Sequence, residues 1–152
     1  MGKRASAVSA SCMITHFSVT PLVVVGVAGG ATDRVSMEDI CTASSSFQHH
    51  VDARRLFPQY EIPLLGVRYF DSSADLEEKA KMSTENNIQK SFQIQIDGNI
   101  RNEFLMNNIK IHLGVFTIGN QFIGSQIELN LLKNSVPNLV FVEIEGASLL
   151  QV

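Results

Sequence analysis

The chain has 152 residues, of which 45% are hydrophobic and 18% charged, and its formal net charge is −3. This length suffices for one domain with a hydrophobic core, and the composition is that of a folded rather than a disordered protein. Because the 12 basic residues are scattered and outnumbered by 15 acidic ones, the sequence offers no basic surface for nucleic acid.

The cysteines and the N-terminus carry only weak signals. Cys12 and Cys41 are too few for a disulfide framework and lack a metal-ligand spacing, so we expect two buried, reduced thiols in a cytoplasmic protein. The opening MGKRAS fits loose patterns for N-myristoylation and for a signal peptide, but residues 5–12 lack the continuous apolar segment of a signal. The most apolar run, residues 21–31, is about half the length of a membrane span. We therefore predict no membrane association.

A helix and two strands are predicted in the first third of the chain. Residues 5–17 have helical spacing and predict a helix, which Pro21 ends. Residues 22–28 are continuously apolar and β-branched, a pattern typical of a central parallel strand covered on both faces. Gly29 and Gly30 then predict a turn, and residues 40–47 predict the second strand.

The middle of the chain predicts a loop, a helix and a half-exposed strand. Residues 54–66 contain two prolines and predict an ordered loop, with Leu56, Phe57 and Leu64 as apolar anchors. The acidic and serine residues at 71–75 predict the start of a helix that runs to about residue 85. Apolar residues at 92, 94 and 96 alternate with polar ones and predict a strand that ends at residues 97–98.

The last third predicts a strand, a helix and a second strand in succession. Residues 109–118 form the first strand, residues 119–124 a loop, and Ser125 caps a helix through about residue 133. Residues 139–142 begin the final strand. Strands that alternate with helices indicate an α/β fold whose sheet is largely parallel.

Two carboxylates, Glu143 and Glu145, follow the last predicted strand. Alternation along a strand points both side chains to the same side of the sheet, where they are costly unless something pairs with them. A solvated strand end is the alternative interpretation. Because ligands of such sheets bind beyond the carboxyl ends of the strands, we expect residues 27–30, 117–125 and 143–146 to form one site.

These three segments together resemble the nucleoside phosphorylase superfamily, and most closely its 5′-methylthioadenosine/S-adenosylhomocysteine nucleosidases. VGVAGG at 25–30 is similar to the family's small-residue loop, GNQFIGS at 119–125 to its Ser-Gly-Asp-x-Phe-Ile segment, and VEIEGA at 142–147 to its Val-Glu-Met-Glu-Gly-Ala motif. The resemblance covers most of the chain and is weakest between residues 82 and 108. It implies a three-layer αβα sandwich with a mostly parallel mixed sheet, in one partial domain over residues 1–152.

The resemblance also implies roles for individual residues. Ala28 and Gly29 lie under the base and ribose, Phe122 stacks on adenine, and the Ile123 backbone binds the edge of the base.

The resemblance also implies that Glu145 is the catalytic candidate and binds the ribose 2′- and 3′-hydroxyls. Glu143 lines the sugar site, and Ile144 replaces a methionine packed on the ribose. Phe57 and Pro63 belong to the loop that reaches the neighbouring subunit's 5′ pocket, which implies a homodimer for the complete protein.

Several positions depart from the family's pattern. The family's purine-protonating Asp lies on a strand after the acid pair, whereas no Asp follows Asp97 here. Its water-activating Glu lies upstream of the position matched by Gly2. Val27 stands in place of Ser or Thr, and His50 in place of Asp. We therefore expect a chain truncated at both ends, and whether it is an enzyme stays open.

The resemblance implies an adenine-nucleoside N-glycosidase that hydrolyses 5′-methylthioadenosine or S-adenosylhomocysteine to adenine and the thioribose product, with no metal or organic cofactor. The chemistry suits the residues, because an oxocarbenium-like sugar needs a nearby carboxylate and the base needs an aromatic face. The alternative is an inactive nucleoside-binding or storage-type relative. A purine nucleoside phosphorylase is disfavoured, since no Arg lies between residues 40 and 50 where relatives hold the anion.

The remaining polar residues have simpler interpretations. His49 and His50 are adjacent, so on a strand they point to opposite faces, and a structural pair is favoured over a metal site. The pair of arginines at 54–55 is expected in a solvated loop rather than a phosphate site. His16 and His112 are expected at the surface or satisfied in the core.

Overall fold

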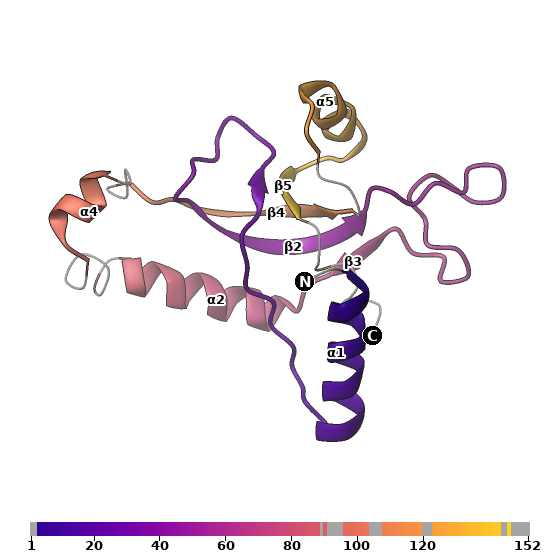
Figure 1. Cartoon of the computed structure of the whole chain (residues 1–152), viewed down its shortest axis with the longest axis horizontal. Helices are drawn as coiled ribbons and strands as arrows, with labels where there is room; N and C mark the ends of the chain where they lie inside the picture. The colour runs from indigo at the N-terminus through magenta and orange to yellow at the C-terminus, as the bar shows by residue number, and fades with distance from the viewer. Residues whose placement is uncertain are drawn as a thin grey trace.

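The computed structural model describes residues 3–88, 90, 96–103, 108–119, 123–143 and 146. Its centre is a five-stranded mixed sheet in the order β1-β5-β4-β2-β3 (Figure 1). The strands are β1 (Gly29–Gly30), β2 (Ile40–Gln48), β3 (Tyr69–Asp71), β4 (Ile111–Ile118) and β5 (Leu139–Glu143). β4 pairs in parallel with both β2 and β5, whereas the edge strands β1 and β3 are antiparallel to their neighbours.

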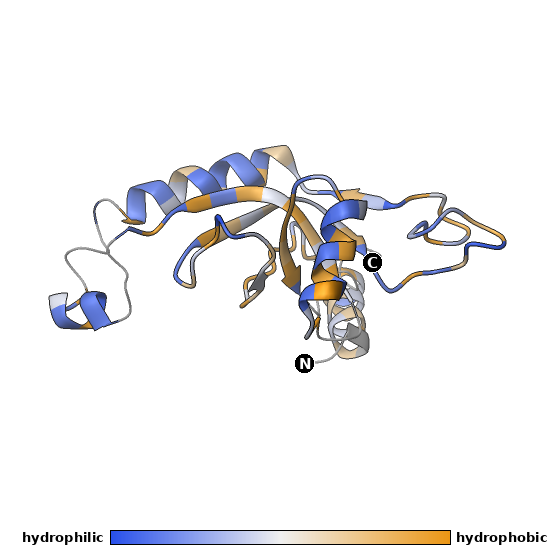
Figure 2. Cartoon of the chain, turned by 90° about the horizontal axis from the view of Figure 1, so that it is seen from above, coloured by the Kyte–Doolittle hydropathy of each residue, from blue (hydrophilic) through white to orange (hydrophobic). Residues whose placement is uncertain are grey.

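The helices described are α1 (Lys3–Phe17), α2 (Ala74–Asn87), α4 (Gly98–Glu103) and α5 (Gln126–Ser135). The helix α4 projects away from the sheet (Figure 1), whereas the other three lie on its two faces. Figure 2 shows α2 along one face and α1 and α5 on the opposite face. The predicted three-layer αβα arrangement with a mixed sheet is therefore confirmed.

Local signals account for the two helices that flank the sheet most closely. The Ser125 hydroxyl accepts a hydrogen bond from the Glu128 amide at 3.2 Å and so caps α5, as predicted. The helix α2 begins after Ser73 and carries two acidic residues in its first turn, where they favour the helix dipole. Leu132 of α5 is buried against the sheet, so α5 contributes to the core.

The core lies between α5, the sheet and the segment that connects β2 to β3. Phe47 of β2 is fully buried, and its ring centroid lies 5.5 Å from that of Tyr60 and 5.7 Å from that of Tyr69. The Arg68 guanidinium lies over both tyrosine rings and donates to the Ser135 carbonyl at 2.9 Å. This cation–π cluster ties β3 to the end of α5.

A partly buried contact between a carboxylate and an imidazole joins β2 and β4 at their amino ends. The Asp39 carboxylate, whose side chain is 1% exposed, contacts His112 Nε2 at 2.8 Å and accepts from the Ser36 and Lys110 amides. Burial raises the pKa of Asp39, but these hydrogen bonds outweigh it, so the pKa lies below its ordinary value. His112 is thus a satisfied histidine, as expected, and His16 is exposed.

The prediction of a buried central strand at residues 22–28 is wrong. Only Gly29 and Gly30 form a strand, antiparallel to β5, and the residues before them pair with no strand in the described part of the chain. Val25 is 91% exposed and Val27 is 97% exposed. The apolar pattern indicates that the segment favours burial. A central parallel strand also needs neighbouring strands to pair with and other elements that cover both of its faces.

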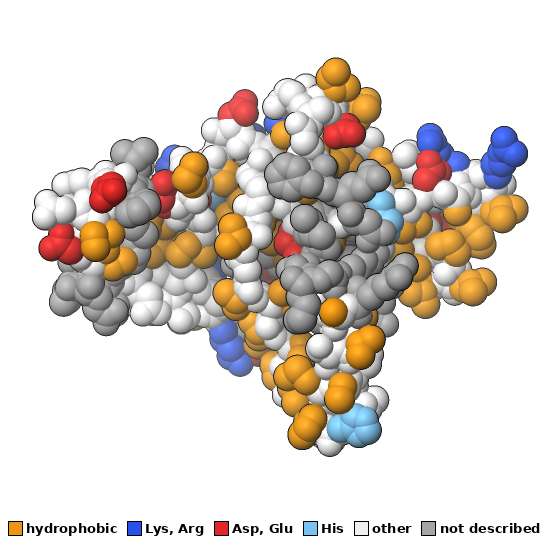
Figure 3. All heavy atoms as spheres, viewed as in Figure 1, with side chains coloured by type: hydrophobic (Ala, Val, Ile, Leu, Met, Phe, Trp, Pro, Cys, Tyr) orange, Lys and Arg blue, Asp and Glu red, His pale blue; other side chains and the backbone are white. Residues whose placement is uncertain are grey.

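The segment between β2 and β3 projects away from the sheet (Figure 1). Leu56 and Leu64, expected as apolar anchors, are 84% and 95% exposed, so this expectation is wrong. The segment is held instead at its base, where Tyr60 is buried and its amide donates to the Val51 carbonyl at 3.2 Å. Figure 3 shows hydrophobic side chains along this projection and basic ones near its tip.

The other predicted elements are placed as follows. The strands expected at 40–47 and 109–118 and the helices expected at 5–17 and 71–85 are confirmed as β2, β4, α1 and α2. Of the alternating residues at 92, 94 and 96, only Ile96 is among the described residues. None of the helices in the described ranges has the length and apolarity needed to cross a bilayer.

Candidate functional site

A cavity of about 540 Å³ opens where β1, β5 and the start of α5 meet. It is lined by residues from three distant parts of the sequence: 27–30, 123–126 with Leu129, and 142–143. Each of the three segments expected to share one site contributes to this lining.

The topology of the sheet explains this convergence. β4 and β5 are parallel, so their carboxyl ends, Ile118 and Glu143, lie at the same edge of the sheet. β1 is antiparallel to β5 and places Gly29 opposite Val142. The residues that follow β4 lead into Ser125, which begins α5 beside the same edge.

Glu143 is the charged residue of the cavity lining and is half-buried. Its Oε2 accepts a hydrogen bond from the Gly146 amide at 2.6 Å, and its backbone carbonyl accepts from the Gly119 amide at 3.2 Å. A Cβ at Gly146 would lie 3.0 Å from Glu143 Oε2, so a glycine suits this turn. The hydrogen bond from the Gly146 amide thereby orients the carboxylate.

Four of the predicted site residues line the cavity: Ala28, Gly29, Ile123 and Glu143. The lining is largely apolar apart from the carboxylate and the polar residues that begin α5. A flat apolar ring with a hydroxylated group attached fits such a mixture.

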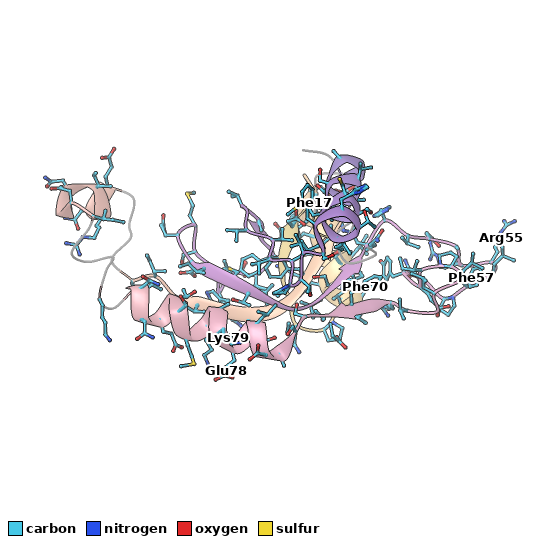
Figure 4. The ribbon with its side chains drawn as sticks, turned by 90° about the horizontal axis from the view of Figure 1, so that it is seen from below. Phe17, Arg55, Phe57, Phe70, Glu78 and Lys79 are labelled. Carbon is cyan, nitrogen blue, oxygen red and sulfur yellow. The ribbon has the colours of Figure 1, made fainter. Side chains whose placement is uncertain are left out.

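The other site predictions are not tested by this geometry. Glu145, Phe122 and Ile144 lie outside the described residues, so the expectation that both glutamates face one side stays a prediction. Phe57 lies on the projecting segment, away from the sheet (Figure 4), and Pro63 belongs to the same segment.

Sequence reasoning missed three residues of the cavity: Gln126, Leu129 and Val142. A signal for the first two was present, because residues three apart at the start of a capped helix face the same neighbour. Val142 was assigned to the last strand and to the family-like motif at 142–147, but not to the expected site. Its partner in the register, Thr117, lies in the segment expected at 117–125.

Metal and thiol chemistry find little support in the described residues. No group of three or more His, Cys, Asp or Glu side chains there is placed to hold a metal ion. Cys12 is exposed on α1, so the expectation of two buried thiols is wrong for this residue. Cys41 is half-buried, and burial, followed by the charge of Asp39, raises the pKa of its thiol to about 12.

The arginine pair on the projecting segment is solvated, as expected. Arg54 and Asp52 are exposed and contact each other at 2.6 Å. The hydrogen bond from the Arg54 guanidinium lowers the pKa of Asp52 below its usual range. The Arg54 guanidinium is therefore paired with the Asp52 carboxylate. This pairing disfavours a phosphate site at Arg54.

Comparisons with known proteins agree on one family. The model of the phosphorylase superfamily matches residues 1–152. A 5′-methylthioadenosine/S-adenosylhomocysteine nucleosidase of Colwellia psychrerythraea is 28% identical over 99% of this chain and 56% of its own length.

Solved structures agree with this match. The Colwellia psychrerythraea nucleosidase in complex with adenine has a TM-score of 0.79 and 26% identity, over 99% of this chain and 55% of the other. A futalosine hydrolase mutant of Helicobacter pylori strain 26695 has a TM-score of 0.75 and 27% identity, over 99% and 60%. The chain thus spans a little more than half the length of these relatives.

Proposed function

The chain belongs to the phosphorylase superfamily, and from this premise we propose that its cavity binds an adenine nucleoside and supports hydrolysis of the N-glycosidic bond. The substrate is 5′-methylthioadenosine or S-adenosylhomocysteine, and the products are adenine and the thioribose. The observation that carries the proposal is the convergence of the three family-like segments on one cavity. The adenine held by the Colwellia psychrerythraea relative supports the same ligand class.

The base occupies the apolar part of the cavity. Ala28 and Gly29 have small or absent side chains, so a planar ring can approach the backbone beside β1. Ile123 and Leu129 provide the opposite wall. Phe122, which follows Gly119 by three residues, supplies the stacking face in this proposal, and the Ile123 backbone binds the edge of the purine.

The ribose occupies the end of the cavity at Glu143. The carboxylate, held by the Gly146 amide, lines the sugar site, and Glu145 binds the 2′- and 3′-hydroxyls. In hydrolysis the bond between C1′ and the purine nitrogen breaks, water adds its oxygen to C1′, and a proton goes to the departing base. Glu145 stabilises the positive charge that develops on the sugar. Ile144 packs on the ribose.

An adenine-release assay tests the proposal. Purified protein is incubated with 5′-methylthioadenosine, free adenine is followed by chromatography, and binding is measured in parallel by calorimetry. Glu145→Gln removes one charge without changing the size of the side chain, so we expect release to fall by about 100-fold or more. Glu78→Gln is the matched control, because Glu78 is exposed on α2 (Figure 4), across the sheet. Release unchanged by Glu145→Gln contradicts the assignment.

Binding without hydrolysis is a second candidate function, and Val27 favours it. Val27 lines the cavity where the nucleosidases have Ser or Thr, so one polar contact beside the base is absent. The same assay separates the two functions. Calorimetric binding with no adenine release supports the inactive binder, whereas release that depends on Glu145 supports the hydrolase.

We also propose that the projecting segment makes a homodimer contact in a cytoplasmic, single-domain protein. Phe57 and Pro63 lie on this segment, and Leu64 beside them is exposed to solvent. Burying these side chains in a second copy lowers the free energy of association by the hydrophobic effect. Analytical ultracentrifugation should show a dimer that Leu64→Ser weakens, and a monomer in both proteins contradicts this contact.

A further inference from the structure

His49 links the carboxyl ends of β2 and β4 beside the cavity. Its Nδ1 lies 2.9 Å from Oγ1 of Thr117, a residue that is fully buried, and its amide donates to the Ile118 carbonyl at 3.2 Å. A buried hydroxyl that loses its hydrogen-bond partner destabilises the folded state, so this pair restricts where the imidazole lies.

The imidazole of His49 fills the space beside Gly119. A Cβ at Gly119 would lie 2.0 Å from His49 Cε1 and 2.1 Å from Nε2, which means that the ring packs directly on the glycine backbone. Gly119 in turn donates its amide to the Glu143 carbonyl at 3.2 Å. A continuous set of contacts therefore runs from His49 through Gly119 to the carboxylate residue of the cavity.

We propose that His49 is a positioning residue of the nucleoside site. Its ring fixes Gly119 against β5, and the Gly119 amide in turn holds the backbone of Glu143 at the cavity. His49 does not line the cavity itself, so it acts through Gly119. This inference rests on the proposed function, because its consequence for the ligand is a change in nucleoside affinity.

The alternative of a metal site at the two histidines is disfavoured. The rings of His49 and His50 are 6.2 Å apart and perpendicular, and no third metal-ligating side chain joins them in the described residues. The geometry thus points to support of the neighbouring glycine.

Three substitutions and one matched control test the proposal. His49→Leu removes both ring nitrogens at similar size, His49→Gln keeps a polar group, and Thr117→Val removes the hydroxyl while keeping the shape. The control is His112→Leu, the same change at the opposite ends of β2 and β4, where it breaks the pair with Asp39. The measurements are hydrogen exchange of the Gly119 amide, the dissociation constant for 5′-methylthioadenosine, and thermal unfolding.

We expect His49→Leu and Thr117→Val each to accelerate Gly119 exchange and to weaken nucleoside binding about tenfold or more, with partial recovery in His49→Gln. The two changes should be non-additive, because they break one contact. His112→Leu should lower the unfolding temperature and leave Gly119 exchange and affinity near those of the wild type. This contrast separates positioning from a general loss of stability.

The opposite results are equally clear. Unchanged Gly119 exchange and affinity in His49→Leu overturn the inference, and so does an equal effect of His112→Leu. If His49→Leu does not fold, Gly119 exchange and nucleoside affinity in Thr117→Val decide between the two outcomes. If the wild type binds no 5′-methylthioadenosine, the proposed function fails, whereas Gly119 exchange in the same variants still decides whether His49 positions this segment.

Discussion

Gly114 of β4 is a position at which a single added methyl group should disturb the sheet. A Cβ there would lie 2.1 Å from Val140 Cγ2 and 3.0 Å from the Asn138 carbonyl oxygen. Both partners belong to the β5 side, next to the irregular register between β4 and β5. The Val140 methyl can turn away at some cost, but the carbonyl belongs to the backbone and also accepts the Val115 amide.

We expect Gly114→Ala to destabilise the protein by about 1 kcal/mol. Overpacking a buried site typically costs about 1–3 kcal/mol, and the lower chain entropy of Ala in the unfolded state offsets about 0.5–1 kcal/mol of this. With a urea dependence of about 2 kcal/mol per molar, the midpoint should fall by about 0.5 M. Urea unfolding followed by circular dichroism measures this shift.

A second substitution tests the stated cause. Val140→Ala removes the methyl group that the new Cβ meets, so the double variant should recover part of the loss. Gly26→Ala is the control, since no atom lies within 4 Å of a Cβ there and we expect a change below about 0.5 kcal/mol. A Gly114→Ala protein as stable as the wild type, or a loss that is independent of Val140, refutes the reasoning.

Three further predictions concern charge, thiol reactivity and capping. The folded state lowers the pKa of Asp39, so the ionised carboxylate stabilises the fold above the ordinary carboxyl pKa, and this stabilisation is lost as the pH falls. In acid titrations, Asp39→Asn should therefore lose less stability than the wild type between about pH 5 and pH 3. A thiol reagent at about pH 8 should modify Cys12 rapidly and Cys41 slowly, as mass spectrometry would show. Ser125→Ala should lose about 1 kcal/mol in urea unfolding, and Ser125→Asp should retain the cap.

Each of these three has a contrary result. If the free energy of unfolding of Asp39→Asn falls with decreasing pH as steeply as that of the wild type, other carboxylates dominate acid unfolding. Rapid modification that persists in Cys12→Ser contradicts the assignment of the fast thiol. Equal stability of Ser125→Ala and the wild type means that the hydroxyl contributes no net capping energy.

Elements with strong local signals were predicted correctly from the sequence. Ser125 has the side chain that caps a helix, and the apolar residues of β4, such as Val115, are those that a buried strand needs. The convergence of three segments also followed from a rule of sheets, since β4 and β5 end at one edge.

The errors arise where local pattern and available partners differ. Val25 and Val27 are strand-forming residues, yet only the glycines after them pair with β5, so the valines stay exposed. Sequence spacing carries no signal for the contact between His49 and Thr117, because 68 residues separate them. Such contacts depend on the register of β2 against β4, which the hydrophobic pattern alone leaves open.

We propose that the cavity between β1, β5 and α5 holds an adenine nucleoside. A titration with 5′-methylthioadenosine, followed in assigned amide NMR spectra, tests this proposal at the cavity itself. The amides of Gly29, Ile123 and Glu143 should shift together with one dissociation constant, while that of His112 at the opposite edge should not move. Shifts that are absent, or that centre on the projecting segment around Phe57 instead, would contradict it.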